Sequence, residues 1–320
     1  MKLRGFAVLF FAFGLAALGQ QDQTPSAAQG SSPSASSEDS KISEPPKLLT
    51  PDVNGALSQE QIQALIRTVA QNHRENYKKQ HDYTYIDREV ERKLDSNRQV
   101  KSTQTKTFEV MELYGEPIMR LIEKDDKPLN EKDAAKEEER IQKIADKRKN
   151  ESEEERRKRD AEKEKARIKG REFVSEIADA YNFRLVGSEI LNGRDNWVIA
   201  GEPRPDFRAH LKEAEMLSKI HGRLWIDKEE IQLAKMDIEA IDTLSFGWVL
   251  ARIHKGTRFV YEETRVNDEV WLPLHYEAKV DVRLALFKND NEQDEGSYRD
   301  YKKFRTSAKI VGMGEVKEQK

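Results

Sequence analysis

The 320-residue chain has 36% charged and 37% hydrophobic residues, a formal net charge of −3 and no cysteine. The missing cysteine excludes disulfides, thiolate metal sites and cysteine catalysis. So high a charged fraction means that part of the chain is solvated rather than core, and the acidic balance argues against a nucleic-acid partner.

The first 19 residues have the pattern of a secretory signal peptide. Lys2 and Arg4 precede an apolar run over residues 6–18, and small residues around Gly19 offer a cleavage site. The run is short for a bilayer span, so we expect residues 1–19 to be cleaved, no membrane segment to remain, and the net charge to become −5. Residues 20–54 are rich in Ser, Pro, Ala and Gln, which predicts a disordered linker.

An amphipathic helix is predicted to begin after Ser58. Ser58 and Gln61 form the S-x-x-Q pattern of a capping box. The residues that follow place one apolar stripe along the helix, at Ile62, Leu65, Ile66, Val69 and His73. We interpret His73, at the edge of this stripe, as a packing residue rather than a chemical one.

Three strands are predicted next, over residues 82–95, 99–114 and 117–124. Their Thr, Val and aromatic content favours strands, and Ser96-Asn97 suits the turn of a hairpin. The alternation is weaker here than elsewhere, because charged and aromatic residues occur at both parities.

A charged insertion follows at residues 130–170, and 28 of the 40 residues in 131–170 are charged. Mixed Glu, Lys and Arg at spacings of three and four form solvated helices through ion pairs. Capping patterns at Asn130 and Ser152 predict two helices with a break near Asn150. The local net charge of +2 is too small for a nucleic-acid arm, and there is no sustained heptad.

The remaining elements are predominantly strands. Asn192-Gly193 is the signature of a type I′ turn, and Pro203 ends the second arm. The second arm of a predicted hairpin at 257–286 alternates apolar and polar residues over 274–286, so one face of the sheet must be covered. The predicted strands are 183–191, 195–202, 222–227, 231–241, 244–253, 257–266, 274–286 and 298–304, with a short helix at 207–220.

No catalytic, metal or cofactor motif is present. The sequence lacks a nucleophile elbow, a Walker loop, an H-E-x-x-H motif and a dinucleotide fingerprint. Its six histidines never occur at metal-ligand spacing. We therefore expect no enzyme, no metal site and no cofactor.

Aromatic residues are instead concentrated on the predicted strands. They are ordinary core residues if the covering helices fill the space above the sheet. If the curved sheet encloses a hollow, they would line an apolar site for acyl chains. The candidate lipid-binding residues are Phe108, Trp197, Trp225, Trp248, Phe259, Tyr261, Trp271 and Tyr276.

Several phrases resemble the LolA/LolB lipoprotein-carrier superfamily, which includes RseB-like domains. They are LYGEPIMRLIEKDDKPL (113–129), NWVIAGEPRP (196–205), HGRLWIDKEEIQLAKMDIE (221–239) and NDEVWLPLHYEAKV (267–280). The resemblance implies an α+β fold over 55–306: a large curved antiparallel sheet, or half-open β-barrel, covered by helices, with a flexible tail at 307–320. It also implies the carriage of acyl chains across the periplasm.

Three functions remain open. The first is a periplasmic protein that binds lipid or lipoprotein acyl chains, serving envelope lipoprotein sorting. The second is an envelope sensor or interaction module in which the charged helices at 131–170 contact another envelope protein. The third, an enzyme such as a hydrolase, would require histidines and carboxylates to converge in one cleft.

Overall fold

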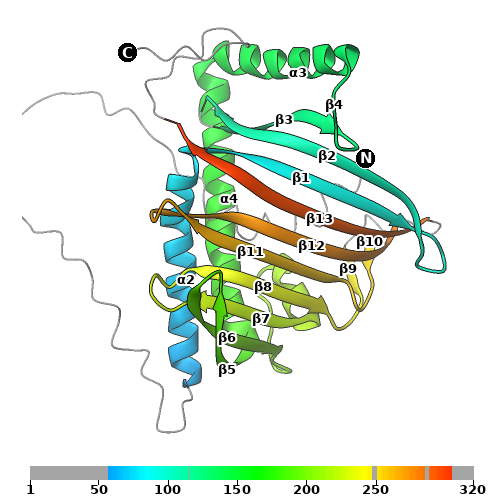
Figure 1. Cartoon of the computed structure of the whole chain (residues 1–320). Helices are drawn as coiled ribbons and strands as arrows, with labels where there is room; N and C mark the ends of the chain where they lie inside the picture. Colours follow the sequence, from blue (N-terminus) through cyan, green and yellow to red (C-terminus); the bar gives the residue numbers. More distant parts are fainter. Residues whose placement is uncertain (1–56, 115, 247–250, 285–287, 305–320) are drawn as a thin grey trace, which may run out of the picture.

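The computed structural model describes residues 57–114, 116–246, 251–284 and 288–304. One 13-stranded sheet dominates it, in the order β4-β3-β2-β1-β13-β12-β11-β8-β7-β6-β5, with β9 and β10 attached beside β12 (Figure 1). Every pairing among these strands is antiparallel. The strands are β1 (Tyr83–Leu94), β2 (Val100–Leu113), β3 (Glu116–Lys124), β4 (Lys127–Pro128), β5 (Tyr181–Leu191), β6 (Arg194–Pro203), β7 (Ile220–Asp227), β8 (Leu233–Ala240), β9 (Leu244–Phe246), β10 (Ala251–Ile253), β11 (Arg258–Val266), β12 (Val270–Leu284) and β13 (Lys288–Lys303).

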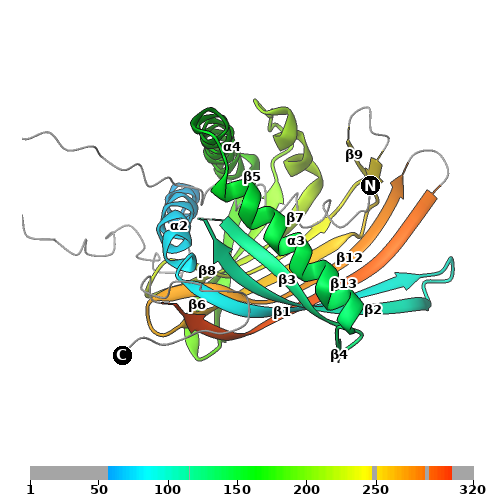
Figure 2. The ribbon, with the colours of Figure 1, turned by 90° about the horizontal axis from the view of Figure 1, so that it is seen from above.

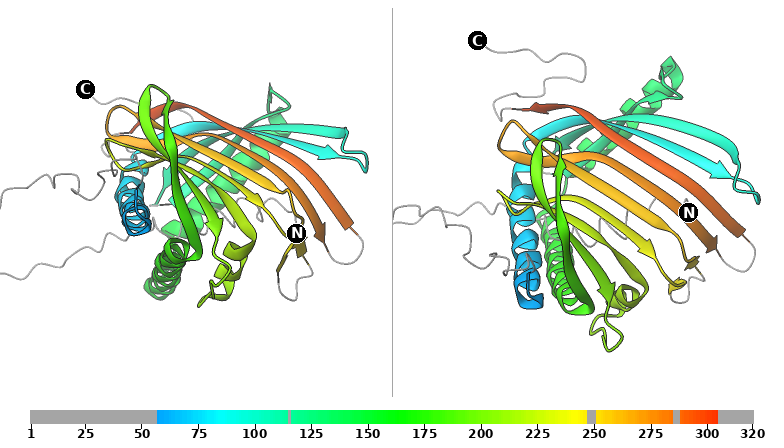
Figure 3. Two further views of the ribbon diagram at one scale, coloured as in Figure 1. Left: turned by 90° about the horizontal axis from the view of Figure 1, so that it is seen from below. Right: turned by 60° about the horizontal axis from the view of Figure 1, so that its bottom comes forward.

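The sheet curves around the helices and does not close, since β4 and β5 form two separate edges. Figure 2 and both views in Figure 3 show the strands arching over α2 (Gln59–Gln80) and α4 (Glu153–Ala180), whereas α3 (Glu131–Lys149) runs beside the β3 edge of the sheet (Figure 1). The α+β fold with a large curved antiparallel sheet and a charged helical insertion is therefore confirmed. The predicted signal, linker, tail and residue 305 onward lie outside the described residues.

Helix α2 crosses the concave face near one end of the strands (Figure 1). Its capping box at Ser58 and Gln61 is present as predicted. The apolar stripe packs on β6, β7 and β8, where Ile62 and Leu65 meet Ile199 and Ile226 in the main core. Burial of these side chains in one cluster fixes the helix across the sheet.

The insertion forms two helices, with Asn150 at the predicted break. Asn130 caps α3, and Ser152 caps α4 with a reciprocal capping box to Glu155. Helix α4 leads directly into β5, so the insertion is tied to the sheet at its far end. None of the helices within the described ranges has the length and apolar content needed to cross a bilayer.

Three predicted elements differ from the structure. The region 244–253 contains two short paired strands, β9 and β10, rather than one strand. The segment 207–220 holds a 3-10 helix, η3 (Lys212–Lys219), and Ile220 already belongs to β7. The last strand begins at Lys288, ten residues before the predicted start. The first half of β13 is polar and lacks the apolar alternation that predicts a strand. It is held in the sheet by backbone pairing with β1 on one side and β12 on the other.

Candidate functional site

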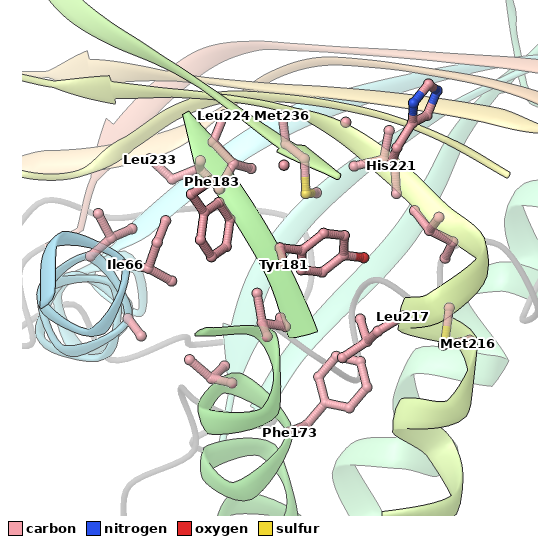
Figure 4. A pocket seen from close by; sticks show the side chains of 18 of the residues that line it. Ile66, Phe173, Tyr181, Phe183, Met216, Leu217, His221, Leu224, Leu233 and Met236 are labelled. Carbon is pink, nitrogen blue, oxygen red and sulfur yellow. The ribbon is translucent and has the colours of Figure 1, made fainter. Parts of the chain in front are cut away.

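An apolar cavity of about 160 Å³ lies on the concave face, enclosed by α2, α4, η3 and the β5–β8 part of the sheet (Figure 4). Of the described residues that line it, only His73, Tyr181 and His221 have nitrogen or oxygen atoms in their side chains. The apolar lining includes Ile66, Val69, Ala70, Phe173, Ile177, Phe183, Met216, Leu217, Leu224, Met236 and Ile238. Such a wall favours hydrocarbon over water.

A buried carboxylate holds η3 over this cavity. Glu176 of α4 is 6% exposed and accepts hydrogen bonds from the backbone N–H groups of His210 and Leu211, at 2.9 and 2.7 Å for the closer contacts. These bonds connect the end of α4 to the segment that leads into η3. Met216 and Leu217 of η3 are thereby placed opposite Phe173 of α4, as Figure 4 shows.

A second cavity, of about 430 Å³, lies further along the concave face, below the C-terminal half of α2. It shares His73 and Met236 with the first, so the two meet at these side chains. Its wall differs in character, because it is rich in tyrosine and carries carboxylates. Residues on β1, β11, β12 and β13 contribute Tyr85, Asp87, Glu89, Tyr261, Glu263, Tyr276 and Tyr298.

Two carboxyl groups of the larger cavity are almost completely buried. Asp87 is 5% exposed, and burial, with a smaller effect from Glu89, raises its pKa to about 8. Glu263 is 1% exposed, and burial raises its pKa to about 7 although the Tyr261 hydroxyl donates to it at 3.0 Å. Both carboxyls are therefore easier to protonate than in water.

His73 stands between the cavities as an uncharged group. Burial and the charge of Arg74 lower its pKa to about 4, and no group in the described structure hydrogen-bonds its Nδ1. At neutral pH the ring is thus neutral. This agrees with the interpretation of His73 as a packing residue at the edge of the stripe.

Three of the sequence-predicted site residues line the larger cavity together: Phe259, Tyr261 and Tyr276. The Phe259 ring stacks with that of Tyr261 and with that of Tyr276, each at 6.4 Å between centroids. Gly296 lies opposite Tyr276 across the β12–β13 pair, and a Cβ there would come within 1.9 Å of the tyrosine ring. The Tyr276 ring therefore lies directly over the backbone of β13.

Among the described residues, the other predicted ones do not line either cavity. Phe108 is paired with Asp87 and so shares the concave face. Trp197 packs at the rim of the main core, and Trp271 is buried, with its indole N–H donating to Glu230 at 2.8 Å. Trp248 lies outside the described residues.

Trp225 is on the wrong face for the predicted role. Its neighbours Leu224 and Ile226 point into the concave side, so Trp225 points to the convex side. There its indole N–H donates to Glu189 at 2.7 Å, and the Lys235 ammonium lies 5.3 Å from the ring centroid. The prediction failed because aromatic character was used without the alternation of β7.

Sequence analysis missed the residues that enclose the small cavity and the acids of the larger one. The helical part of the lining, Phe173 and Ile177, is in the apolar stripe that ends the charged insertion, which was a usable signal. The larger cavity had a signal too: Tyr83, Tyr85, Asp87 and Glu89 alternate along β1. Within the described ranges, no three His, Asp or Glu side chains are arranged to hold a metal ion.

No family model matches the sequence. No curated protein matches it either. Solved structures do match in fold. A domain described as an outer membrane lipoprotein-sorting protein domain, from Vibrio parahaemolyticus, has 11% identity and a TM-score of 0.33, over 79% of this chain and 96% of that one. A LolA superfamily protein from Nitrosomonas europaea has 8% identity and a TM-score of 0.28, over 76% of this chain and 93% of that one.

The complex of MucA and MucB from Pseudomonas aeruginosa also matches, with 10% identity, a TM-score of 0.21 and coverage of 74% of this chain and 93% of that one. LolA-superfamily structures are thus among those similar to this chain, as the sequence resemblance predicted. At these identities and scores the likeness concerns the fold and says nothing about a ligand or an activity.

Proposed function

We propose that this protein binds acyl chains of lipids or lipoproteins in the trough on the concave face of its sheet. The observation that carries the proposal is the hydrocarbon-walled cavity between α2, α4, η3 and β5–β8. The signal expected at residues 1–19 would deliver the protein to the periplasm, where it would carry such molecules in envelope lipoprotein sorting. No covalent chemistry is part of this function.

The energetics favour hydrocarbon as the occupant. Each methylene moved from water into an apolar site contributes about 0.8 kcal/mol. His73 and Met236 line both spaces, so the two cavities adjoin at these side chains, and a longer chain would extend from the small cavity along them into the larger one. The neutral His73 ring places no charge in the path.

Filling the cavity with a side chain tests the proposal. Ala70 lines the small cavity from α2, whereas Ala64 of the same helix does not. Ala70→Phe places a ring in the space that a ligand would use. We expect it to weaken binding of the uncharged probe N-phenyl-1-naphthylamine at least about tenfold, the loss of roughly two methylenes of burial.

Ala64→Phe is the matched control and should leave the affinity within about twofold. Thermal denaturation of both variants separates occlusion from unfolding, and Ala70→Phe should melt no lower than the parent chain because it fills a void. Equal affinities for the two variants, or no saturable uptake by the parent chain, would remove the binding proposal.

In that case a protein-interaction function on the same scaffold becomes the better account. The first turns of α4 are solvated: the side chains of Glu153 and Arg157 are 90% and 82% exposed. Such exposed charges contribute little to stability, so they are available to a protein partner.

A further inference from the structure

The larger cavity has an acidic wall. Asp87, Glu89, Glu112 and Glu263 line it, and no lysine or arginine does so among the residues that the structure describes. Its second histidine, His81, already contacts Glu112 at 2.6 Å. Where these acids are ionised, an occupant that neutralises the wall must therefore carry positive charge.

Two of these acids each have one carboxyl oxygen that accepts no hydrogen bond from the described residues. Oδ1 of Asp87 and Oε2 of Glu263 are buried, and no donor in the described parts of the chain hydrogen-bonds either atom. Both side chains are more than nine-tenths buried and both line the cavity. A buried acceptor without a donor is costly, so a ligand that donates to these oxygens gains more than it would from an exposed carboxylate.

Aromatic rings complete the wall on the β13 side. The rings of Tyr85 and Tyr298 are 5.9 Å apart, edge to face, and those of Tyr276 and Tyr298 are 6.2 Å apart. All three line the cavity with Asp87. The faces of such rings attract cations, and the attraction is stronger where water is excluded.

We propose that the larger cavity binds the ammonium group of a cationic amphiphile, with Asp87 and Glu263 as its carboxylate partners and the tyrosines as its aromatic wall. The inference rests on the proposed function, because the alkyl chain of the same molecule occupies the small cavity. A primary ammonium brings three N–H donors, which suits two acceptors and an aromatic face. A carboxylate or phosphate head group would meet four acids instead.

A comparison of three ligands with one chain length tests the inference: decylamine, 1-decanol and decanoate, titrated against the full chain at pH 8.5. At this pH Asp87, with its pKa of about 8, is mostly ionised, and the alkylamine is still cationic. We expect decylamine to bind at least about tenfold more tightly than 1-decanol, and decanoate more weakly than both.

Isosteric variants identify the partners. Asp87→Asn and Glu263→Gln keep the shape of the side chain and remove its charge. Each should bring the affinity for decylamine down at least about fivefold while leaving 1-decanol within about twofold. Glu277→Gln, on β12 next to Tyr276 but exposed on the other face, is the control and should change neither.

The outcomes distinguish the two proposals. If 1-decanol binds but decylamine has no advantage over it, or if the variants leave the ratio unchanged, the cation site is wrong and the acyl-chain site stands. If none of the three ligands binds, the proposed function fails and the cation site fails with it. Should a variant not fold, the comparison of decylamine with decanoate in the parent chain still decides.

Discussion

Glu263 is a buried carboxyl group that costs stability, as expected of a residue kept for binding rather than for packing. A carboxyl that is 1% exposed, and to which the Tyr261 hydroxyl is the one hydrogen-bond donor among the described residues, is costly to keep in a folded protein. Its raised pKa means that the folded chain holds the proton more tightly than the unfolded chain. The charge therefore weakens the fold at neutral and alkaline pH.

The sign of this effect gives a pH-dependent prediction for Glu263→Gln. Below pH 4.5 the carboxyl is protonated in both the folded and the unfolded chain, and between pH 4.5 and about 7 only the folded chain keeps the proton. The free energy of unfolding of the parent chain should therefore fall relative to that of the variant as pH rises through this window. The difference should grow by at most about 3 kcal/mol.

Urea denaturation of both proteins from pH 4 to pH 9 measures this difference. Its growth with pH is the readout, since the amide also alters the hydrogen bond to Tyr261 at every pH. If the free energies of unfolding of the two proteins differ by the same amount at every pH, burial does not raise the pKa of Glu263 and the prediction is contradicted.

At the scale of single elements, two helices protect the free edges of the open sheet. Glu137 of α3 accepts from the backbone N–H of Leu121 at 2.8 Å, and Arg140 donates to the backbone carbonyl of Met119, both on the outer edge of β3. At the opposite edge, Gln59 of α2 accepts from Phe183 N–H at 2.9 Å and donates to the Tyr181 carbonyl at 2.7 Å. Unpaired strand edges promote pairing with other chains, so these contacts give the charged insertion a structural role.

Removing the α3 contacts should open the edge of β3. In the double variant Glu137→Ala, Arg140→Ala, the Leu121 N–H loses a charge-assisted hydrogen bond. We expect its hydrogen exchange to accelerate at least about tenfold. The control is the double variant Glu139→Ala, Lys143→Ala, which removes an exposed ion pair of 2.6 Å on the same helix. If the Leu121 N–H exchanges equally slowly in both double variants, α3 does not cap the strand.

The elements also show what sequence can and cannot predict. The caps at Ser58, Asn130 and Ser152 were readable because capping depends on residues three positions apart. The first ten residues of β13, 288–297, were not, because these polar residues are held by pairing with β1 and β12, which no local pattern reveals. Trp225 was assigned to the site although the alternation of β7 places it on the convex face.

At the scale of the whole molecule, the trough exists only when distant segments meet. The small cavity joins Ile66 of α2, Phe173 of α4, Leu217 of η3 and Leu224 of β7, which are spread over more than 150 residues. Periodicity predicted an antiparallel sheet with one face covered, and the resemblance to the LolA/LolB superfamily implied that this sheet is curved and covered by helices. The size and polarity of the space between them depend on tertiary packing, so only the structure could provide them.

The dependence of affinity on chain length tests the central claim most directly. For 1-alkanols from hexanol to decanol, titrated against the full chain by calorimetry, each added methylene should tighten binding about fourfold until the cavity is filled. Ala70→Phe should reach its plateau at a shorter chain than the parent protein or Ala64→Phe. Affinity that does not change from hexanol to decanol in the parent chain would contradict an acyl-chain trough on the concave face.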